Sequence, residues 1–192
     1  MNLKRIMLVA SMALALVAVA APASASANWL KHHKPITQNE HIEVEGVLGF
    51  AIPGVASYRC EIDITATLFA GTTTGEIDTF DITTNKCVGE GGLQACTLKG
   101  DHTFDLPWEM HVETNEAGEP DITITDVTIT NTYNDNTPNC PVHDSTVIFP
   151  AVTATPDNPT TMSTLTVSGT GAGGIQAFGT ASVTPKATFG IE

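Results

Sequence analysis

The sequence predicts an all-β protein: a single β-sandwich, immunoglobulin-like or jelly-roll-like, that is stapled by disulfides and exported behind a cleaved signal peptide. Three observations predict this. The chain opens with a leader pattern, much of the rest alternates apolar and polar residues with a period of two, and all four cysteines follow the leader. A period of two indicates half-buried strands, and turn signals every ~8–12 residues are typical of sandwiches and barrels. A β-solenoid is the rival architecture, but the sequence has no fixed repeat.

The first 27 residues have the pattern of a secretory signal peptide. Lys4 and Arg5 form a short basic region, an apolar stretch follows from Ile6 to Ala21, and small residues continue to Ala27. The apolar stretch is shorter than the ~20 residues that a membrane-spanning helix needs. We therefore expect cleavage after Ala27, a secreted protein that is extracellular or on the cell surface, and no transmembrane anchor in the mature chain.

The mature chain is expected to form one domain. Removing 27 of the 192 residues leaves 165, of which 28–40 are expected to form an extended arm and 41–192 the sandwich. Without Lys4 and Arg5, six basic residues stand against 21 acidic ones, so the net charge is about −15. A charge of this sign repels nucleic acid, and the chain has no basic patch, so we expect no nucleic-acid partner.

The strand pattern is clearest from Cys60 to Ala70, where small and apolar residues occupy every second position. One face of this strand is expected to be buried and the other to lie in water. The run from Glu76 to Thr84 also alternates, but it slips by one residue at Asp78, and a later run slips at Asp126. A single extra residue in a strand predicts a β-bulge.

The cysteines are expected to form two disulfides. Four cysteines in an exported chain allow three pairings, and no CxxC spacing points to a metal site. A hairpin centred near Thr73 places Cys60 opposite residue 86 or 87, within disulfide reach. This favours Cys60–Cys87, which leaves Cys96–Cys140. The alternative joins Cys87 to Cys96 across the glycine-rich loop between them.

A second alternating run spans residues 104–113. Leu106, Trp108 and Met110 share its apolar face, so we expect Trp108 to be a buried core anchor and not a surface for a ligand. Pro107 lies within the run and cannot donate a ladder hydrogen bond, which predicts an edge strand or a bulged one. An exposed edge accepts a strand from another chain, so the arm either joins such an edge or stays disordered.

The polar face of this run carries the candidate metal ligands. Glu109, His111 and Glu113 are weak candidates for a divalent metal site or for acid and base catalysis, because a site needs further groups from other elements. A solvated strand face explains the same row. The loop from Asn131 to Asp144 has oxygen ligands that calcium prefers, but its composition is also that of a turn.

No motif in the chain makes a case for catalysis. The sequence has no Gly-x-Ser-x-Gly elbow, no His-Glu-x-x-His helix and no phosphate-binding glycine loop. We therefore expect a protein that is not an enzyme and that needs no cofactor.

The order of these features resembles that of small secreted bacterial proteins of the alkane-oxidation-activator (PraB) type and of similar actinobacterial secreted proteins. The features are, in order, Cys60, Cys87, Cys96, the step Leu106-Pro107-Trp108 and Cys140 in a polar loop. The resemblance implies association with the cell surface or biofilm matrix. It implies structural roles for the first and last cysteines and the Leu-Pro-Trp step, and no catalytic residue. The chain departs from the pattern by its acidity and by an extra cysteine.

The expected function is that of a non-enzymatic extracellular or cell-surface protein in a matrix, a biofilm or adhesion. Its expected partners are further copies of itself or components of the surface. Two alternatives remain open: a module that binds a glycan or a hydrophobic ligand, and a metal-dependent hydrolase built on the acidic and histidine row.

Overall fold

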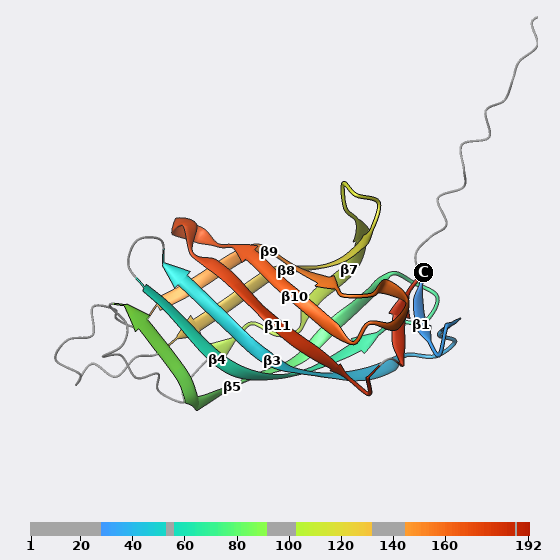
Figure 1. Ribbon diagram of the computed structural model, residues 1–192, viewed down its shortest axis with the longest axis horizontal. Coiled ribbons are helices and arrows are strands. Elements are labelled where there is room, and N and C mark those ends of the chain that lie inside the picture. The colour runs from blue at the N-terminus through green and yellow to red at the C-terminus, as the bar shows by residue number, and fades with distance from the viewer. Residues whose placement is uncertain (1–27, 53–55, 92–102, 132–144, 187) are drawn as a thin grey trace, which may run out of the picture.

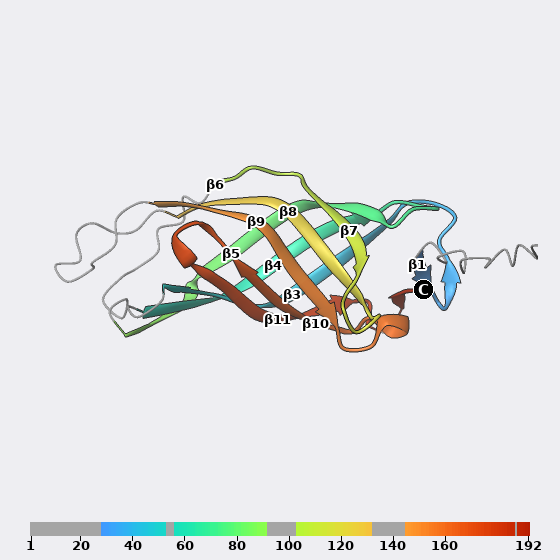
Figure 2. The ribbon, with the colours of Figure 1, turned by 90° about the horizontal axis from the view of Figure 1, so that it is seen from above.

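The computed structural model describes residues 28–52, 56–91, 103–131, 145–186 and 188–192. Within them, eight antiparallel strands form a closed barrel (Figures 1 and 2). In chain order these strands are β3 (Glu40–Ile52), β4 (Ala56–Leu68), β5 (Thr74–Gly91), β7 (Trp108–Thr114), β8 (Pro120–Asn131), β9 (Ser145–Pro156), β10 (Thr164–Thr170) and β11 (Gln176–Thr184). Each pairs with the next along the chain, and β11 pairs with β3. This is an up-and-down barrel.

The barrel corrects the expectation of a sandwich. The all-β class is confirmed, but the pairings of β8 with β9 and of β11 with β3 close one sheet on itself instead of leaving two sheets face to face. A strand with one buried face suits either architecture. The alternation in the sequence could therefore predict strands without deciding how the sheet closes.

The alternation separates the inside of the barrel from the outside. On β4, Ile62 and Ala66 are buried inside, whereas Glu61 and Asp63 are exposed outside. The other barrel strands follow the same rule, so the interior is a core of aliphatic and aromatic side chains. The acidic residues lie largely on the outer surface, where water solvates them.

The bulge that the sequence predicted at Asp78 is present. Thr65 pairs with Thr79 while Ala66 pairs with Ile77, so Asp78 is an extra residue on β5. At Asp126 the ladder holds no extra residue, because Thr125 pairs with Ala151 and Val127 pairs with Phe149 in one unbroken register. Asp126 instead has a φ of 54°, and this local change in the backbone returns Val127 to the inside of the barrel.

A small second sheet lies at one end of the barrel, where β1 and the C-terminus meet in Figure 1. Its strands are β1 (Trp29–Lys31), β2 (Lys34–Pro35) and β12 (Phe189–Ile191), and β1 lies in the middle. Trp29 pairs with Ile191, and both are buried. Residues of the expected arm thus pair with the end of their own chain.

Short elements complete the described structure. Two turns of 3-10 helix, η1 (Pro159–Thr161) and η2 (Ala172–Gly174), precede and follow β10, and β6 (Thr103–Phe104) pairs with β8 beside the barrel. Pro107 lies between β6 and β7, so it is outside any strand, contrary to the expectation of an edge strand that contains it. In the part of the chain that the structure describes, no helix is long and apolar enough to cross a membrane.

Candidate functional site

The candidate metal ligands lie on the outer face of β7, as the alternation predicted. His111 Nε2 is 3.0 Å from Glu113 Oε1, and Thr123 Oγ1 on β8 donates a hydrogen bond of 3.1 Å to Glu113 Oε2. The hydrogen bond from His111 is the main cause that lowers the pKa of Glu113, followed by the bond from Thr123 and the charge of His111. Glu109 lies in register with Glu76 on β5.

This row does not assemble into a metal site within the described ranges. No three His, Cys, Asp or Glu side chains among those residues are placed to hold a metal ion. His111 and Glu113 form a pair with each other. Glu109 instead lies in register with Glu76 on β5. The geometry therefore gives the hydrolase hypothesis no support, and the calcium candidates between Asn131 and Asp144 lie largely outside the described residues.

A hydrogen-bonded chain of His41, Thr67 and Asp78 lies at another place on the outer face. Thr67 Oγ1 donates to Asp78 Oδ2 over 2.7 Å and lies 3.0 Å from His41 Nδ1. The single hydroxyl proton of Thr67 is used toward Asp78, so His41 must be the donor toward Thr67. A nucleophile in a catalytic triad donates to the histidine instead, and the carboxylate contacts the histidine. This order does not activate the threonine.

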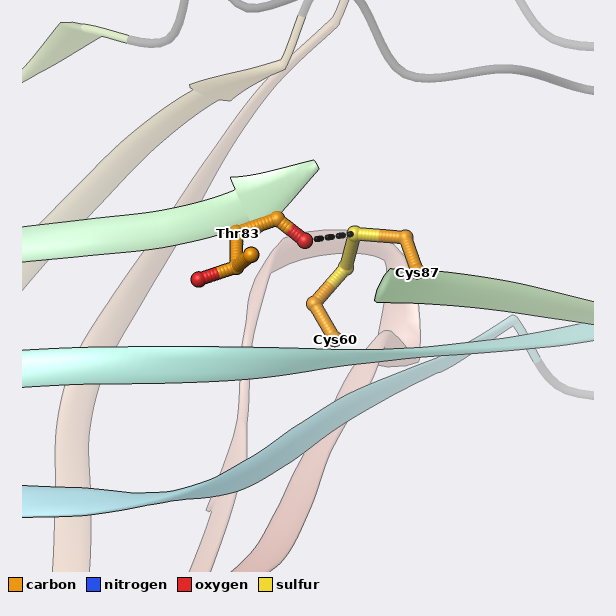
Figure 3. Close-up of a disulfide and its surroundings, with 3 residues drawn as sticks. All are labelled: Cys60, Thr83 and Cys87. Atoms are coloured by element: carbon orange, nitrogen blue, oxygen red, sulfur yellow. Dashed lines mark hydrogen bonds between the residues drawn. A yellow bond between two sulfur atoms is a disulfide. The ribbon is translucent and has the colours of Figure 1, made fainter. Parts of the chain in front are cut away.

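The predicted disulfide between Cys60 and Cys87 is confirmed. Figure 3 shows Cys60 on β4 joined to Cys87 on β5, and the carbonyl oxygen of Thr83 lies 3.7 Å from the sulfur of Cys87. The bridge spans a shift in the β4–β5 register, where Arg59 pairs with Val88 but Glu61 pairs with Thr83. It ties the two strands together where their ladder is irregular. Cys96 and Cys140 lie outside the described residues.

The Leu-Pro-Trp step places an aromatic side chain in the core. Trp108 is 3% exposed, in agreement with the buried face that the alternation predicted, whereas Leu106 is partly buried and Pro107 is exposed. The ring of Trp108 packs 5.3 Å from the ring of Phe80 on β5 and 6.1 Å from that of Phe104 on β6, centroid to centroid. The three rings fill the side of the barrel where the β5–β7 ladder ends at Ile77.

The feature that sequence reasoning missed is a cavity inside the barrel. It has a volume of about 90 Å³ and is lined by apolar and aromatic residues from all eight barrel strands. Trp29 from the small sheet and Met162, which follows η1, also line it, so the elements at one end of the barrel are part of its wall. None of the lining residues is titratable. The inward residues are visible in the alternation, but the space they leave unfilled depends on packing across the barrel.

Comparisons with known proteins identify no relative: no family model matches the sequence, and neither the curated proteins nor the solved structures contain a significant match. The resemblance to PraB-type secreted proteins therefore stays a prediction.

Proposed function

We propose that this chain is an exported, non-enzymatic binding protein whose barrel interior takes up a small apolar molecule. The observation that carries the proposal is the apolar cavity of about 90 Å³. Protein interiors are packed about as densely as organic crystals, and an apolar cavity of this kind stays dry because water finds no hydrogen-bond partners there. An apolar guest gains dispersion contacts in such a space and loses contact with water. The interior of an eight-stranded barrel is either filled by side chains or just wide enough to hold one small ligand.

The size of the cavity limits its guest. An engineered cavity of about 150 Å³ binds benzene, so a space of this volume takes a smaller molecule unless side chains move. Met110 and Met162 both line the cavity. Methionine has three rotatable bonds and fills irregular gaps, so these two side chains are the means by which the cavity would adapt to a larger guest.

Support for a non-enzymatic role comes from the chemistry of the same cavity. With no titratable or nucleophilic side chain in its wall, the cavity has no group that would transfer a proton or form a covalent intermediate. Binding is the activity that an apolar wall alone supports.

The test uses the two methionines of the mature chain as probes. Methionine occurs at positions 1, 7, 12, 110 and 162, so cleavage of the leader leaves only the two in the cavity wall. Their methyl groups, labelled with ¹³C, are expected to shift in NMR spectra in a saturable way under increasing pressure of xenon, an apolar atom that is smaller than benzene and enters dry apolar cavities. Ala154→Leu fills the cavity from β9 and is expected to abolish the shift.

Ala151→Leu is the matched control, since Ala151 lies on the outer face of the same strand. It is expected to leave the titration as in the natural protein. The absence of any saturable methyl shift in the natural protein would overturn the proposal.

A role in a matrix or on the cell surface is the second candidate, and it concerns location more than the cavity. Its support is the leader pattern and the resemblance to PraB-type proteins. The expected route of self-association through the arm has no support in the described residues, because β1 pairs with β12 of the same chain. Fractionation of the native culture tests this candidate: recovery from the matrix or cell surface supports it, and recovery only as free protein in the medium contradicts it.

A further inference from the structure

An open groove lies on the outer face of the barrel, separate from the interior cavity. It crosses β9, β10, β11 and the end of β3, four strands that lie side by side (Figure 1). Its volume is about 570 Å³, within the range of roughly 300–1,000 Å³ that is usual for sites that bind small molecules. The groove therefore has room for a ligand that is too large for the cavity of about 90 Å³.

The wall of this groove is polar, and none of the described residues that line it is charged. Its polar groups are the hydroxyl groups of Thr153, Ser168 and Thr170 and the side-chain amide of Gln176. A hydroxyl group and an amide can each donate and accept hydrogen bonds. The wall therefore suits a ligand whose own polar groups both donate and accept.

The lack of charge extends over the three strands that carry most of the groove. β9, β10 and β11 contain no charged residue, although the chain as a whole is strongly acidic. On the other side of the sheet order, Glu45, Asp63 and Asp81 lie opposite one another on β3, β4 and β5. Charged side chains are the usual means of keeping an outer surface soluble. An uncharged sector on an acidic barrel thus favours a neutral ligand over an ionic one.

One aromatic ring also lines the groove. Phe178 on β11 lies across Gly49 on β3, where an added Cβ atom would come within 2.5 Å of the ring. The guanidinium carbon of Arg59 is 5.2 Å from the centroid of the same ring. These contacts hold a partly exposed ring against the sheet, where its electron-rich face can attract the C–H groups of a ligand.

We propose that this groove binds a neutral glycan. The hydroxyl groups of a sugar form hydrogen bonds with the hydroxyl and amide groups of the wall, and the C–H groups of a sugar ring pack on Phe178. The site is distinct from the cavity and does not depend on the function proposed above. A peptide strand fits less well, because all four strands are paired on both sides and offer no edge for strand addition.

The competing explanation is that Phe178 only covers Gly49. An aromatic side chain that packs over a glycine stabilises a sheet without any ligand. In that case the hydroxyl groups beside it would meet only water, and the groove would bind no glycan.

The first experiment titrates the ¹⁵N-labelled mature protein with cellohexaose, mannohexaose and chitohexaose, three neutral sugar hexamers. With at least one of them, the backbone amide signals of β9–β11 and the side-chain amide signal of Gln176 are expected to shift in a saturable way. The ¹³C methyl signals of Met110 and Met162 in the cavity wall should stay unchanged. Hexagalacturonate, an anionic hexamer, is the control and should cause no saturable shift.

A matched pair of variants on β10 then tests the position of the site. Ser168 and Thr166 are both exposed on the outer face of this strand, and of the two only Ser168 lines the groove. Ser168→Glu is expected to lower the affinity for the bound hexamer about tenfold or more, because it puts a bulky charge where the ligand offers none. Thr166→Glu adds the same charge outside the groove and should keep the affinity of the natural protein.

The outcomes are distinct. Saturable shifts on β9–β11 together with a loss of affinity in Ser168→Glu alone support the proposal. Binding of none of the neutral hexamers, equal losses in the two variants, or shifts that lie away from β9–β11 would overturn it. If Ser168→Glu fails to fold, the shifts in the natural protein decide alone. None of these results affects the proposed function, because the methionine methyl signals report on the cavity separately.

Discussion

Glu113 and His111 illustrate what single residues contribute on the outer surface. Their contact is a surface pair, held by one hydrogen bond between them and one from Thr123. Because solvent screens such pairs, they add little to stability, and their clearest signature is a change in the pKa of the carboxyl group. Trp108 is the opposite case: it is buried, and the one polar atom of its side chain, Nε1, has no hydrogen-bond partner among the described residues.

The expected result for the surface pair concerns His111→Ala. This variant removes the largest cause of the lowered pKa of Glu113, so that pKa should rise toward the ordinary value for glutamate. The folded-state pKa is lowered, so the contact stabilises the fold above the unfolded pKa, and this contribution is lost as the pH falls through the folded pKa. A titration of the ¹³C carboxyl signals measures the change.

Asp157 is the control for this titration. The pKa of Asp157 is also lowered, chiefly by a hydrogen bond from the backbone N–H of Thr164 and also by hydrogen bonds from the hydroxyl and backbone N–H of Ser163. None of these contacts involves His111. The pKa of Asp157 should stay the same in the variant. An unchanged pKa of Glu113 would show that the histidine contact is not formed in solution.

At the scale of elements, Gly46 on β3 and Gly179 on β11 allow these two strands to lie close together in the barrel. A Cβ atom added at Gly46 would lie 2.3 Å from the carbonyl oxygen of Thr180, and one at Gly179 would lie 2.2 Å from that of Val47. Both clashes are with backbone of the neighbouring strand, which cannot rotate away as a side chain does. The close approach of the two strands therefore requires glycine at both positions.

Gly46→Ala is expected to destabilise the barrel by about 1–3 kcal/mol or more, because the added methyl group forces β3 away from β11. Urea unfolding measures the loss. The control is Val47→Ala at the next position, where the side chain is 42% exposed, and it should change the free energy of unfolding by about 0.5 kcal/mol or less. Equal effects of the two substitutions would mean that the strands are not so close.

At the scale of the whole molecule, the first and last described strands, β1 and β12, form a small sheet at one end of the barrel. Trp29 connects the parts: its strand pairs with β12, its indole group donates to Thr74 at the start of β5, and its ring lines the cavity. Contacts of this kind make the small sheet part of the same core as the barrel. The sheet should therefore unfold together with the barrel.

Trp29→Ala is expected to cost about 3–5 kcal/mol, the usual loss for a large buried side chain. Urea unfolding followed by circular dichroism should still show one transition, at a lower midpoint. Lys34→Ala, an exposed position on β2, is the control and should unfold like the natural protein. A separate early transition in Trp29→Ala, with the midpoint of the barrel unchanged, would show that the small sheet is an independent unit.

Local patterns in the sequence determined the strands, the bulge at Asp78 and one disulfide. The run from Cys60 shows its buried face directly, the slips at Asp78 and Asp126 mark where that face is regained, and a hairpin register is enough to place Cys60 beside Cys87. These features depend on residues close in sequence or on one tight turn. The backbone period and turn geometry therefore make them predictable.

The tertiary structure alone decided the closure of the barrel, the pairing of β1 with β12, the cavity and the exposed place of Pro107. It also decided the turn between β1 and β2, where His32 and His33 have positive φ angles of 52° and 60° although neither is the usual glycine or asparagine. The alternation in a strand determines which of its faces is buried, but it does not determine which other strand pairs with it. The reason is that the backbone groups that form the ladder hydrogen bonds are the same in almost every residue. The neighbours, and the space left between side chains, follow from packing among segments far apart in the chain.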